Sequence, residues 1–435
     1  MHDSPTSQIR PLDHGTVAGA VEVLDGKSKR GRLARLLPFL GPAFVASVAY
    51  VDPGNFATNI EAGAHYGYLL LWVIVASNLM AMLVQTLSAK LGIASGRNLA
   101  ELCRDNFPRP VVWGMWVIAE LVAIATDLAE FLGAAIGFNL LFHIPLFPAA
   151  LITGVVTLLI LALERYGFRP VEAVITVLVG VIAVSYLIET VLDRPDWADT
   201  AMHAIVPRFQ GTRSVLLAAG ILGATVMPHV IFLHSALTQS RIVPRDAGWA
   251  RRIYRFERID VVVAMMIAGA VNGAMLIMAA ATFHQQGLEE IASIEEAYRT
   301  LTPLLGRAAS TVFALSLLAA GLSSATVGTM AGQVIMQGFL HRTIPIWLRR
   351  LVTMVPALVV IGVGLDPTST LVLSQVALSF GLPFALVPLV LFTMRRQIMG
   401  ALVNHKITTS IAWGVTSLIV ALNLFLLYRL TVGGG

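Results

Sequence analysis

Long apolar segments recur along the whole chain, and short polar segments separate them. Most of them hold about 20 residues, the length that an α-helix needs to cross the hydrocarbon core of a bilayer. The pattern predicts eleven membrane spans, at 37–63, 67–89, 111–137, 147–163, 170–192, 214–239, 258–283, 309–336, 346–364, 369–394 and 408–428. The fourth is short, so we expect it to tilt little or to be partly covered by its neighbours.

The composition supports a polytopic helical membrane protein, because 57% of the residues are hydrophobic and only 13% are charged. Soluble domains carry roughly 25% charged residues, so a water-soluble α-helical protein is the weaker alternative. The single cysteine, Cys103, excludes an internal disulfide framework and a cysteine-based metal site. We expect no signal peptide, because the first apolar segment begins near Leu36, behind a polar and basic stretch.

The basic residues are distributed unequally between the two sides of the predicted membrane. Of the 30 Lys and Arg residues, 24 lie in the N-terminal tail or near the loops after spans 2, 4, 6, 8 and 10. The positive-inside rule makes that side cytoplasmic. We therefore expect a protein of the cell (inner) membrane, with its N-terminus in the cytoplasm and its C-terminus outside. The net charge of +5 reflects this topology, and no nucleic-acid partner is expected.

Two of the predicted spans are interrupted by turn-forming residues. Span 1 contains the sequence Asp52-Pro53-Gly54-Asn55, and span 6 contains Met227-Pro228-His229. Proline cannot continue the helical hydrogen-bond ladder, and glycine tolerates unusual backbone angles. Within a membrane, a broken backbone is tolerated only where protein buries it or where it lines a polar cavity. Ordinary proline kinks are the alternative interpretation of each break.

The two broken spans lie five spans apart, so they enter the membrane from opposite sides. We therefore expect an inverted repeat of five plus five helices, with a broken helix at the start of each half. The repeats would lie at 36–195 and 210–395 of a single transmembrane domain at 36–435, with an extra helix at 408–428. Residues 1–35 would form a disordered cytoplasmic tail. This arrangement is typical of secondary transporters that bind their substrate at the membrane midplane.

The residues at the breaks favour a divalent transition-metal ion as the substrate. Each half-helix that ends in the membrane presents unpaired carbonyl groups and the negative end of its dipole. Asp52 adds a carboxylate, Asn55 an amide oxygen and Met227 a thioether sulfur. Asp52 alone would suit Na⁺ or H⁺ equally well. A soft sulfur contributes little to binding Ca²⁺ or Mg²⁺, so the mixed set fits Mn²⁺ or Fe²⁺ better.

These two motifs, in these two spans, resemble the signatures of the Nramp family (natural resistance-associated macrophage proteins), and the resemblance covers nearly the whole chain. The family implies a leucine-transporter-type fold and proton-coupled transport of divalent metals. It also implies that Asp52, Asn55, the Ala224 carbonyl and Met227 bind the metal, with Gln375 of span 10 as an additional ligand. The presence of the methionine resembles the manganese and iron type.

Three acidic residues lie within predicted span 3, where charged side chains are rare and usually functional. At about 100° per residue, Glu120 and Asp127 lie about 20° apart around the helix axis, and Glu130 lies about 60° from Asp127. This stripe is a candidate proton route with His229 as a relay. The alternative is a buried polar network that only joins helices, with Arg350 or another arginine at the cytoplasmic end as its partner. In Nramp proteins the corresponding acids and a span 9 arginine form the proton exit route.

Three further features lie outside the two breaks and the acidic stripe. Ser324, Gly328 and Gly332 of span 8 form a ridge of small residues that suits close helix packing. Asp260, near the start of span 7, is expected to be a solvated cap residue, and His234 either lines an inner vestibule or bonds a neighbouring helix.

The sequence thus predicts an importer of divalent transition-metal ions that is coupled to protons, acts as a monomer and needs no cofactor. The alternative is a cation-coupled amino-acid transporter of the same fold, which the anionic Asp52 disfavours because it would repel a substrate carboxylate. A sensor or a channel is a third class. An enzyme is not expected, since the sequence has no nucleotide-binding loop, nucleophile–base set or zinc-type spacing.

Overall fold

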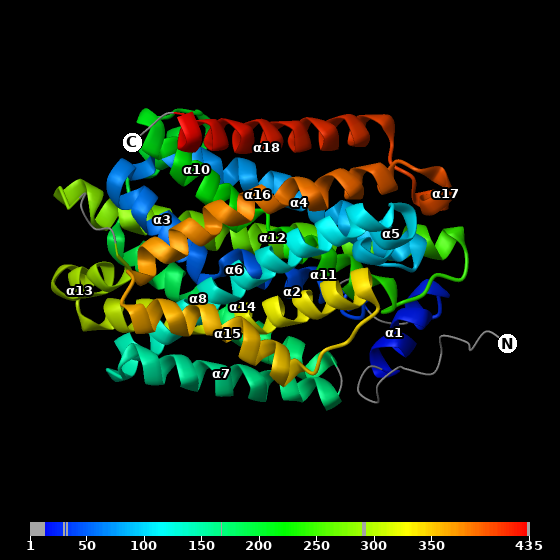
Figure 1. Cartoon of the computed structure of the whole chain (residues 1–435), viewed down its shortest axis with the longest axis horizontal. Helices are drawn as coiled ribbons and strands as arrows, with labels where there is room; N and C mark the ends of the chain where they lie inside the picture. The colour runs from blue at the N-terminus through cyan, green and yellow to red at the C-terminus, as the bar shows by residue number, and fades with distance from the viewer. Residues whose placement is uncertain (1–13, 29–30, 32–33, 167, 289–292, 433–435) are drawn as a thin grey trace.

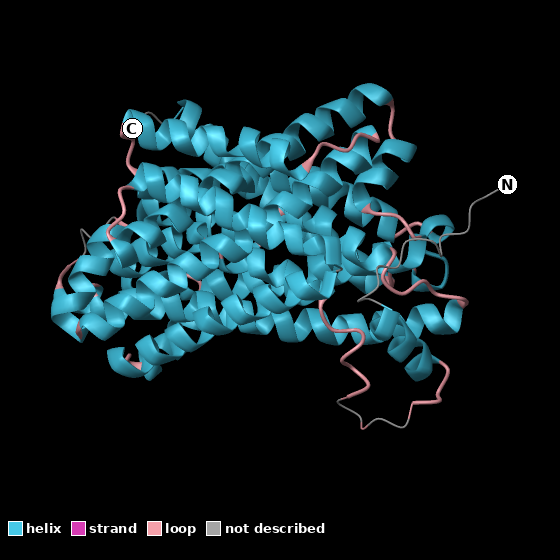
Figure 2. Ribbon diagram, turned by 90° about the horizontal axis from the view of Figure 1, so that it is seen from below, coloured by secondary structure: helices cyan, strands magenta, loops and turns pink. Residues whose placement is uncertain are grey.

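The computed structural model describes residues 14–28, 31, 34–166, 168–288 and 293–432. Every regular element within these ranges is a helix (Figure 2). Figure 1 shows the long helices side by side along the long axis of the molecule, with α18 (Lys406–Val432) at one edge and α7 (Leu146–Ala162) at the other. The helix α5 (Leu99–Asn106) lies at one end of this bundle, and α13 (Ile294–Leu305) lies at the opposite end. We call these the α5 end and the α13 end.

The eleven predicted spans each have a helical counterpart. Nine helical stretches in the described ranges are long and apolar enough to cross a membrane, and Pro42–Val51 and Leu146–Ala162 are shorter apolar segments. The stretch Pro53–Ser95 contains the second half of span 1 and the whole of span 2, which are separated by the 3₁₀ turn η4 (Gly67–Leu70). The spans not yet given bounds are α4 (Leu71–Ser95), α6 (Arg109–Phe142), α8 (Phe168–Asp193), α12 (Ala247–Thr282), α14 (Arg307–Leu340), α15 (Ile346–Val363) and α16 (Pro367–Thr393).

Spans 1 and 6 are broken, as the sequence predicts. Span 1 consists of α2 (Pro42–Val48), the 3₁₀ turn η3 (Ala49–Val51) and α3 (Pro53–Tyr66), and span 6 consists of α10 (Gly211–Thr225) and α11 (Pro228–Gln239). Pro53 and Pro228 are each the first residue of a second half-helix, a position where the missing N–H removes no intrahelical bond. Each proline therefore begins a half-helix after the break, and does not kink a continuous one.

Shorter helices connect the spans at the two ends. At the α5 end lie α5, α17 (Arg396–Met399) and α1 (His14–Leu24) (Figure 1). The remaining elements are α9 (Trp197–Ile205), η5 (Leu163–Tyr166), η6 (His284–Gln286) and η7 (Gly400–Leu402).

The N-terminal tail is not wholly disordered, which corrects the expectation for residues 1–35. Residues 14–24 form α1, and residues 1–13 lie outside the described residues. Ala20 and Leu24 are buried, and Arg252 of α12 donates a hydrogen bond to the backbone oxygen of Leu24 at 2.7 Å. The composition of the tail as a whole is polar, but these apolar positions are enough to pack one short helix against α12.

The helix of span 7 begins earlier than its apolar segment does. Asp246 caps α12 by accepting a hydrogen bond from the backbone N–H of Trp249 at 2.8 Å. The first turns of α12 carry the basic residues Arg251, Arg252, Arg255 and Arg258. A charged helical extension beyond an apolar segment has no hydrophobic signature, so hydropathy alone places the boundary about eleven residues late.

Close contact between α6 and α14 forms the centre of the bundle. A Cβ atom added to Gly137 of α6 would overlap the backbone of Leu318, and one added to Gly321 of α14 would overlap the backbone of Ala134. Small residues allow helix backbones to approach in this way. The two glycines thus bring α6, which carries the three acidic residues, directly against α14.

Replacing Gly137 by leucine should destabilise the protein, because the new side chain would meet the α14 backbone. Overpacking of this kind typically costs about 1–3 kcal/mol. We expect a lower midpoint of thermal unfolding in detergent than for the wild type. Gly114→Leu on the same helix is the control, since a Cβ there meets no atom within 4 Å. Equal midpoints for the two variants would contradict the close α6–α14 packing.

Candidate functional site

Asp52 occupies the break in the first span. Its backbone is extended, with φ −92° and ψ 168°, and its side chain caps α3. Carboxylate Oδ1 accepts hydrogen bonds from the backbone N–H of Asn55 at 2.8 Å and from the side-chain amide of Asn55 at 2.7 Å. The residue is fully buried, and Oδ2 has no hydrogen-bond partner among the described residues. The helix therefore orients one carboxylate oxygen and leaves the other available.

Asn55 connects the break in span 1 to the break in span 6. Its side-chain amide also donates a hydrogen bond to the carbonyl oxygen of Ala224, one residue before α10 ends, at 3.1 Å. Two oxygen atoms, from Asp52 and Ala224, thus accept hydrogen bonds from one buried nitrogen. The amide oxygen of Asn55 is buried and has no hydrogen-bond partner in the described part of the chain. A cation could take the place of this nitrogen if the amide turned to present its oxygen.

Gln375 of α16 lies against both breaks. A Cβ on Gly54 would overlap the Gln375 side chain, and a Cβ on Gly223 would overlap the Gln375 backbone carbonyl. Two glycines therefore make room for this residue. The amide nitrogen of Gln375 donates to Ser374 at 3.3 Å, whereas its amide oxygen is buried without a partner among the described residues. The sequence alone gives no reason to choose Gln375; only the family resemblance indicates it.

Met227 lies at the N-cap position of α11 and is fully buried. Its side chain makes no capping hydrogen bond, and it belongs to the main apolar cluster together with Val226 and Val230. A thioether is a weak hydrogen-bond acceptor but a good ligand for soft and borderline metal ions. The second break therefore supplies a carbonyl group and a buried sulfur, in contrast to the carboxylate and amide of the first.

The chemistry of this region follows from its unpaired oxygen atoms. Asp52, Asn55 and Gln375 each bury one oxygen without a hydrogen-bond partner among the described residues. Such atoms are costly unless water, a proton or a cation satisfies them. The described ranges contain no group of three or more His, Cys, Asp or Glu side chains that could hold a metal. A metal at the breaks would thus depend on one carboxylate together with neutral amide, carbonyl and thioether ligands.

The acidic stripe of α6 begins directly beside the first break. A Cβ on Gly133 would overlap Pro53, so α6 passes against the break without an intervening side chain. Glu130, one turn away, is completely buried, and both of its oxygens lack a hydrogen-bond partner among the described residues. Asp127 is also buried, and its Oδ1 lies 3.5 Å from the guanidinium of Arg350 on α15. The structure thus brings Arg350 to the stripe, as the sequence reasoning expects of its partner.

The ridge of small residues on α14 has a different role from the one expected. A Cβ on Gly328 would overlap the carboxyl group of Glu130 and approach that of Asp127, and a Cβ on Gly332 would overlap the guanidinium of Arg349. These two glycines therefore accommodate charged side chains, whereas other glycines bring the α6 and α14 backbones together.

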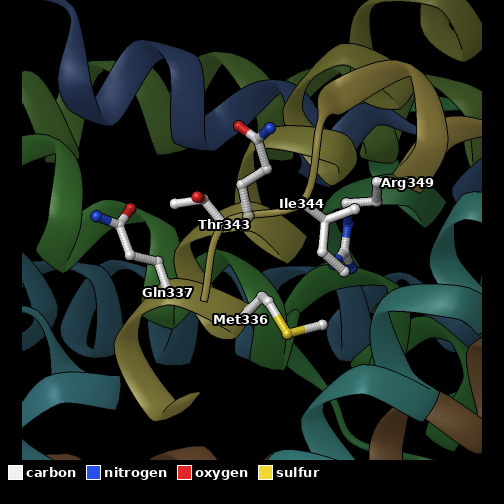
Figure 3. A pocket seen from close by; sticks show the side chains of 6 residues that line it. Met336, Gln337, Thr343, Ile344 and Arg349 are labelled. Carbon is white, nitrogen blue, oxygen red and sulfur yellow. The ribbon is translucent and has the colours of Figure 1, made fainter. Parts of the chain in front are cut away.

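Arg349 pairs with the third acidic residue; the sequence indicated a second arginine as a possible partner but did not identify it. Its guanidinium lies 2.8 Å from Glu120, and the Arg349 side chain is nearly fully buried. Arg349 also borders a pocket at the α5 end of α14, together with Met336 and Thr343 (Figure 3). The remaining lining residues are Gln333, Gln337 and Ile344. The stripe therefore runs from the first break toward this pocket at the α5 end.

The two histidines of α11 have different surroundings. The Nδ1 atom of His229 lies 3.3 Å from the Thr126 hydroxyl of α6, and its Nε2 is buried without a partner among the described residues. His234 bonds both neighbouring helices, through Nδ1 to Gln85 at 2.8 Å and through Nε2 to Glu257 at 3.1 Å. Of the two expectations for His234, the structure supports the hydrogen bond between helices, and it places His229 beside the acidic stripe.

Asp260 is not a solvated cap residue, which corrects the sequence expectation. It is buried, and its Oδ2 accepts hydrogen bonds from the backbone N–H groups of Gly41 and Ala43, each at 3.0 Å. It therefore caps α2, which is far away in the sequence, and not its own helix. Arg241 holds the same segment by donating to the Leu40 carbonyl at 2.9 Å. Contacts between such distant residues leave no local sequence signal.

A chain of polar groups extends from the first break into the bundle. The side chain of Asn272 donates to the carbonyl oxygen of Tyr50 at 2.6 Å, and Gln85 donates to the Tyr50 hydroxyl at 2.5 Å. Asn59 in turn donates to the amide oxygen of Asn272 at 3.0 Å. Sequence reasoning missed these residues, although Asn272 stands out as a polar residue in the apolar α12.

Comparison with known proteins places this geometry in a family. Residues 43–429 match the family model described as "Natural resistance-associated macrophage protein-like". The chain is 57% identical to the "Divalent metal cation transporter MntH" of Deinococcus radiodurans over 429 residues, which cover 99% of this chain and 98% of that protein.

Solved structures agree with this result. A manganese transporter from Eremococcus coleocola superposes with a TM-score of 0.83 at 37% identity, covering 92% of this chain and 88% of that one. The structure of MhsT in complex with L-phenylalanine superposes with a TM-score of 0.60 at 14% identity, covering 88% of this chain and 98% of that one, which indicates a shared fold alone.

These findings confirm an all-α polytopic membrane protein of eleven transmembrane helices with the leucine-transporter-type fold of five plus five inverted helices, broken at spans 1 and 6. They also identify a metal transporter and not an enzyme. The chain belongs to the Nramp family, the natural resistance-associated macrophage proteins.

Proposed function

We propose that this chain imports divalent transition-metal ions, chiefly Mn²⁺ and Fe²⁺, across the cell membrane together with protons, by alternating access. The single observation that carries the proposal is that Asp52, Asn55 and Gln375, which lie at or against the two helix breaks, each bury an oxygen without a hydrogen-bond partner among the described residues. The Ala224 carbonyl and the buried Met227 complete a mixed set of ligands. That set suits borderline divalent ions better than Ca²⁺ or Mg²⁺.

Metal binding would replace a hydrogen-bond donor, the Asn55 amide nitrogen, by a cation. In the structure, the Asn55 amide nitrogen lies between the Asp52 carboxylate and the Ala224 carbonyl. An incoming metal ion would lose most of its water and take that position, and the amide would turn to present its oxygen. The Asp52 oxygen that is not engaged in capping α3 would bind the metal without releasing the helix.

Protons would leave through the acidic stripe. A metal ion beside Asp52 favours the ionised carboxylate, so a proton held there or on Glu130 is displaced. Asp127 with Arg350 and then Glu120 with Arg349 offer successive sites toward the α5 end. His229 would relay protons between the breaks and this stripe. The alternative, a buried network that only joins α6 to α15, predicts no coupling.

The proposed orientation places the α5 end in the cytoplasm, because most of the basic residues lie near it. The metal would enter from the α13 end and leave after the short α2 swings away from the bundle. We propose that the protein works as a monomer, since one chain contains both breaks and the complete acidic stripe.

An amino-acid transporter of the same fold is the second candidate. The likeness to MhsT concerns the fold alone, and the anionic Asp52 at the first break would repel a substrate carboxylate. Relatives that share more than half of their residues with this chain are named as divalent metal transporters. Metal transport is therefore the better supported function.

The decisive experiment measures Mn²⁺ uptake into proteoliposomes that contain a pH-sensitive dye, with Ca²⁺ as a competitor. We expect saturable Mn²⁺ uptake together with internal acidification. Uptake of a labelled amino acid that is insensitive to Mn²⁺ would instead favour the second candidate, and conductance without saturation would favour a channel.

The Asp52→Ala variant should reduce Mn²⁺ uptake to the level of empty liposomes, because it removes the carboxylate that the first break supplies. Asp366→Ala is the matched control. Asp366 also precedes a proline and caps a helix, by accepting from the Ser369 N–H at 2.6 Å, but it is exposed and remote from the breaks. Both variants lose a helix cap worth about 1 kcal/mol, so Asp366→Ala shows the effect of cap loss alone. Near-normal uptake by Asp52→Ala would refute the metal site.

The Met227→Ala variant should retain Mn²⁺ uptake but lose discrimination against hard cations. We expect the Ca²⁺ concentration that halves Mn²⁺ uptake to fall about tenfold, which corresponds to about 1.4 kcal/mol of relative affinity. Met265→Ala, which removes another fully buried methionine side chain from α12, controls for the cavity. If Met227→Ala leaves Ca²⁺ competition unchanged, the sulfur is not a ligand.

The Glu130→Gln variant should weaken the coupling of metal to protons, because glutamine has nearly the same shape but cannot carry a proton between sites. We expect a smaller internal acidification for each Mn²⁺ ion taken up. Glu22→Gln, on the exposed surface of α1, should leave the ratio unchanged. A wild-type ratio for Glu130→Gln would assign the acidic stripe a structural role only.

A further inference from the structure

A second group of buried acidic side chains lies on α8, away from the breaks and from α6. Tyr186, Glu189 and Asp193 follow one another at spacings of three and four residues, which places them on one face of the helix. Asp193 ends α8 on the side of the α13 end, and its Oδ1 accepts a hydrogen bond from the Thr282 hydroxyl of α12 at 2.9 Å. Glu189 lies one turn deeper in the bundle.

Glu189 is the unusual member of this group. It is completely buried, and neither carboxyl oxygen has a hydrogen-bond partner among the described residues. The second oxygen of Asp193 is likewise buried and unpaired there. No ion pair in the described part of the chain includes either residue, whereas Glu120 and Asp127 of α6 each pair with an arginine.

Among the described residues, the elements packed against α8 bring no positively charged group to Glu189 or Asp193. Thr282 of α12 bonds Asp193, Ser316 of α14 lies beside the Tyr186 hydroxyl, and Phe56 of α3 meets the Tyr186 ring edge-on at 5.5 Å between ring centroids. The titratable groups that act on Glu189 are therefore Asp193 and Tyr186 of its own helix. Two ionised carboxylates one turn apart would repel each other strongly in so apolar a setting.

The pair therefore needs a proton or a cation, and the geometry favours a proton. A dehydrated divalent cation requires about six oxygen ligands. Here the two carboxyl groups offer only three unpaired oxygens among the described residues. One proton, by contrast, neutralises one carboxyl group and can be shared with the other.

The position of the pair connects the α13 end with the first break. Asp193 is half-buried and gives access from that end, and Glu189 lies about 6 Å further along the helix axis. Tyr186 continues the row and contacts Phe56, the residue directly after Asn55. A change of charge at Glu189 thus acts close to the half-helix that carries Asp52 and Asn55.

We propose that Glu189 and Asp193 form a second proton-binding site, separate from the stripe on α6, which takes up a proton from the outer solution and sets how metal uptake depends on external pH. The proton passes from hydronium to a carboxylate oxygen and forms an O–H bond there. When the pair loses this proton, two uncompensated negative charges are buried where α8 packs against its neighbours, which disfavours this packing and with it the arrangement of α3 that binds metal. This proposal rests on the proposed function, because it concerns metal uptake.

The experiment compares wild type, Glu189→Gln and Asp193→Asn in Mn²⁺ uptake at external values from about pH 5.5 to about pH 8, at a fixed internal pH. Wild-type uptake should fall as the external pH rises, with the pair deprotonating. Glu189→Gln mimics the protonated form, so it should match the wild type at the acidic end. Its half-maximal external pH should be higher by about one unit or more, with Asp193→Asn shifted in the same direction.

A stability measurement tests the site without transport. Thermal unfolding midpoints in detergent should fall for the wild type between about pH 5 and about pH 8, because the folded pair holds a proton that the unfolded chain releases. Glu189→Gln should show a smaller fall, and Glu22→Gln, whose side chain is exposed on α1, should behave like the wild type. These midpoints do not depend on metal transport, so they separate failure of this proposal from failure of the proposed function.

Three outcomes would overturn the inference. The first is a Glu189→Gln variant whose uptake depends on external pH as in the wild type, and the second is a Glu189→Gln variant whose unfolding midpoint depends on pH as in the wild type. The third is that the variant loses a bound Na⁺ or Ca²⁺ ion that the wild type holds. The last outcome would identify a cation site instead. Because the midpoints of Asp193→Asn can be measured independently, a Glu189→Gln variant that fails to fold still leaves the proposal testable.

Discussion

The hydrogen bond from the Asn55 side chain to the Ala224 carbonyl is the contact on which the centre of the molecule depends. It connects two interrupted helices whose exposed backbone groups would otherwise be unsatisfied in an apolar environment. The remaining helices adjust to this junction: α16 brings Gln375 against Gly54 and Gly223, and α6 brings Gly133 against Pro53. Burying two helix breaks therefore requires glycines at the points of contact, both on the broken spans and on α6.

Hydropathy and proline positions were sufficient to predict the spans, the two breaks and the fold, because each of these leaves a local signal in the sequence. The carboxylate, amide and thioether at the breaks follow from the same short motifs. The structure adds contacts between residues more than 200 positions apart, such as Asp260 with Gly41 and Arg349 with Glu120. The sequence predicted that the two broken spans meet, but no local signal indicates which individual residues of other distant helices pair, so these partners could not be predicted.

The acids of α6 and those of α8 are buried in physically different settings. On α6, Asp127 and Glu120 face arginines of α15, and Gly328 and Gly332 of α14 leave space for the charged groups. On α8, Glu189 has no positively charged partner in the described residues. Asp127 and Glu120 can stay ionised because arginines balance their negative charge. Glu189 has no such partner among the described residues, so each proton that it binds or releases changes the charge of its surroundings by one unit.

The capping of α2 by Asp260 has a consequence for the movement of that half-helix. Both N–H groups at its start bond one buried carboxylate oxygen, and Asn272 binds the carbonyl of Tyr50 at its other end. A small displacement would break these bonds without admitting water to replace them, so intermediate positions are unfavourable. The segment should therefore have two stable positions, one packed in the bundle and one exposed to water. It should switch between them without populated intermediates, and not bend gradually.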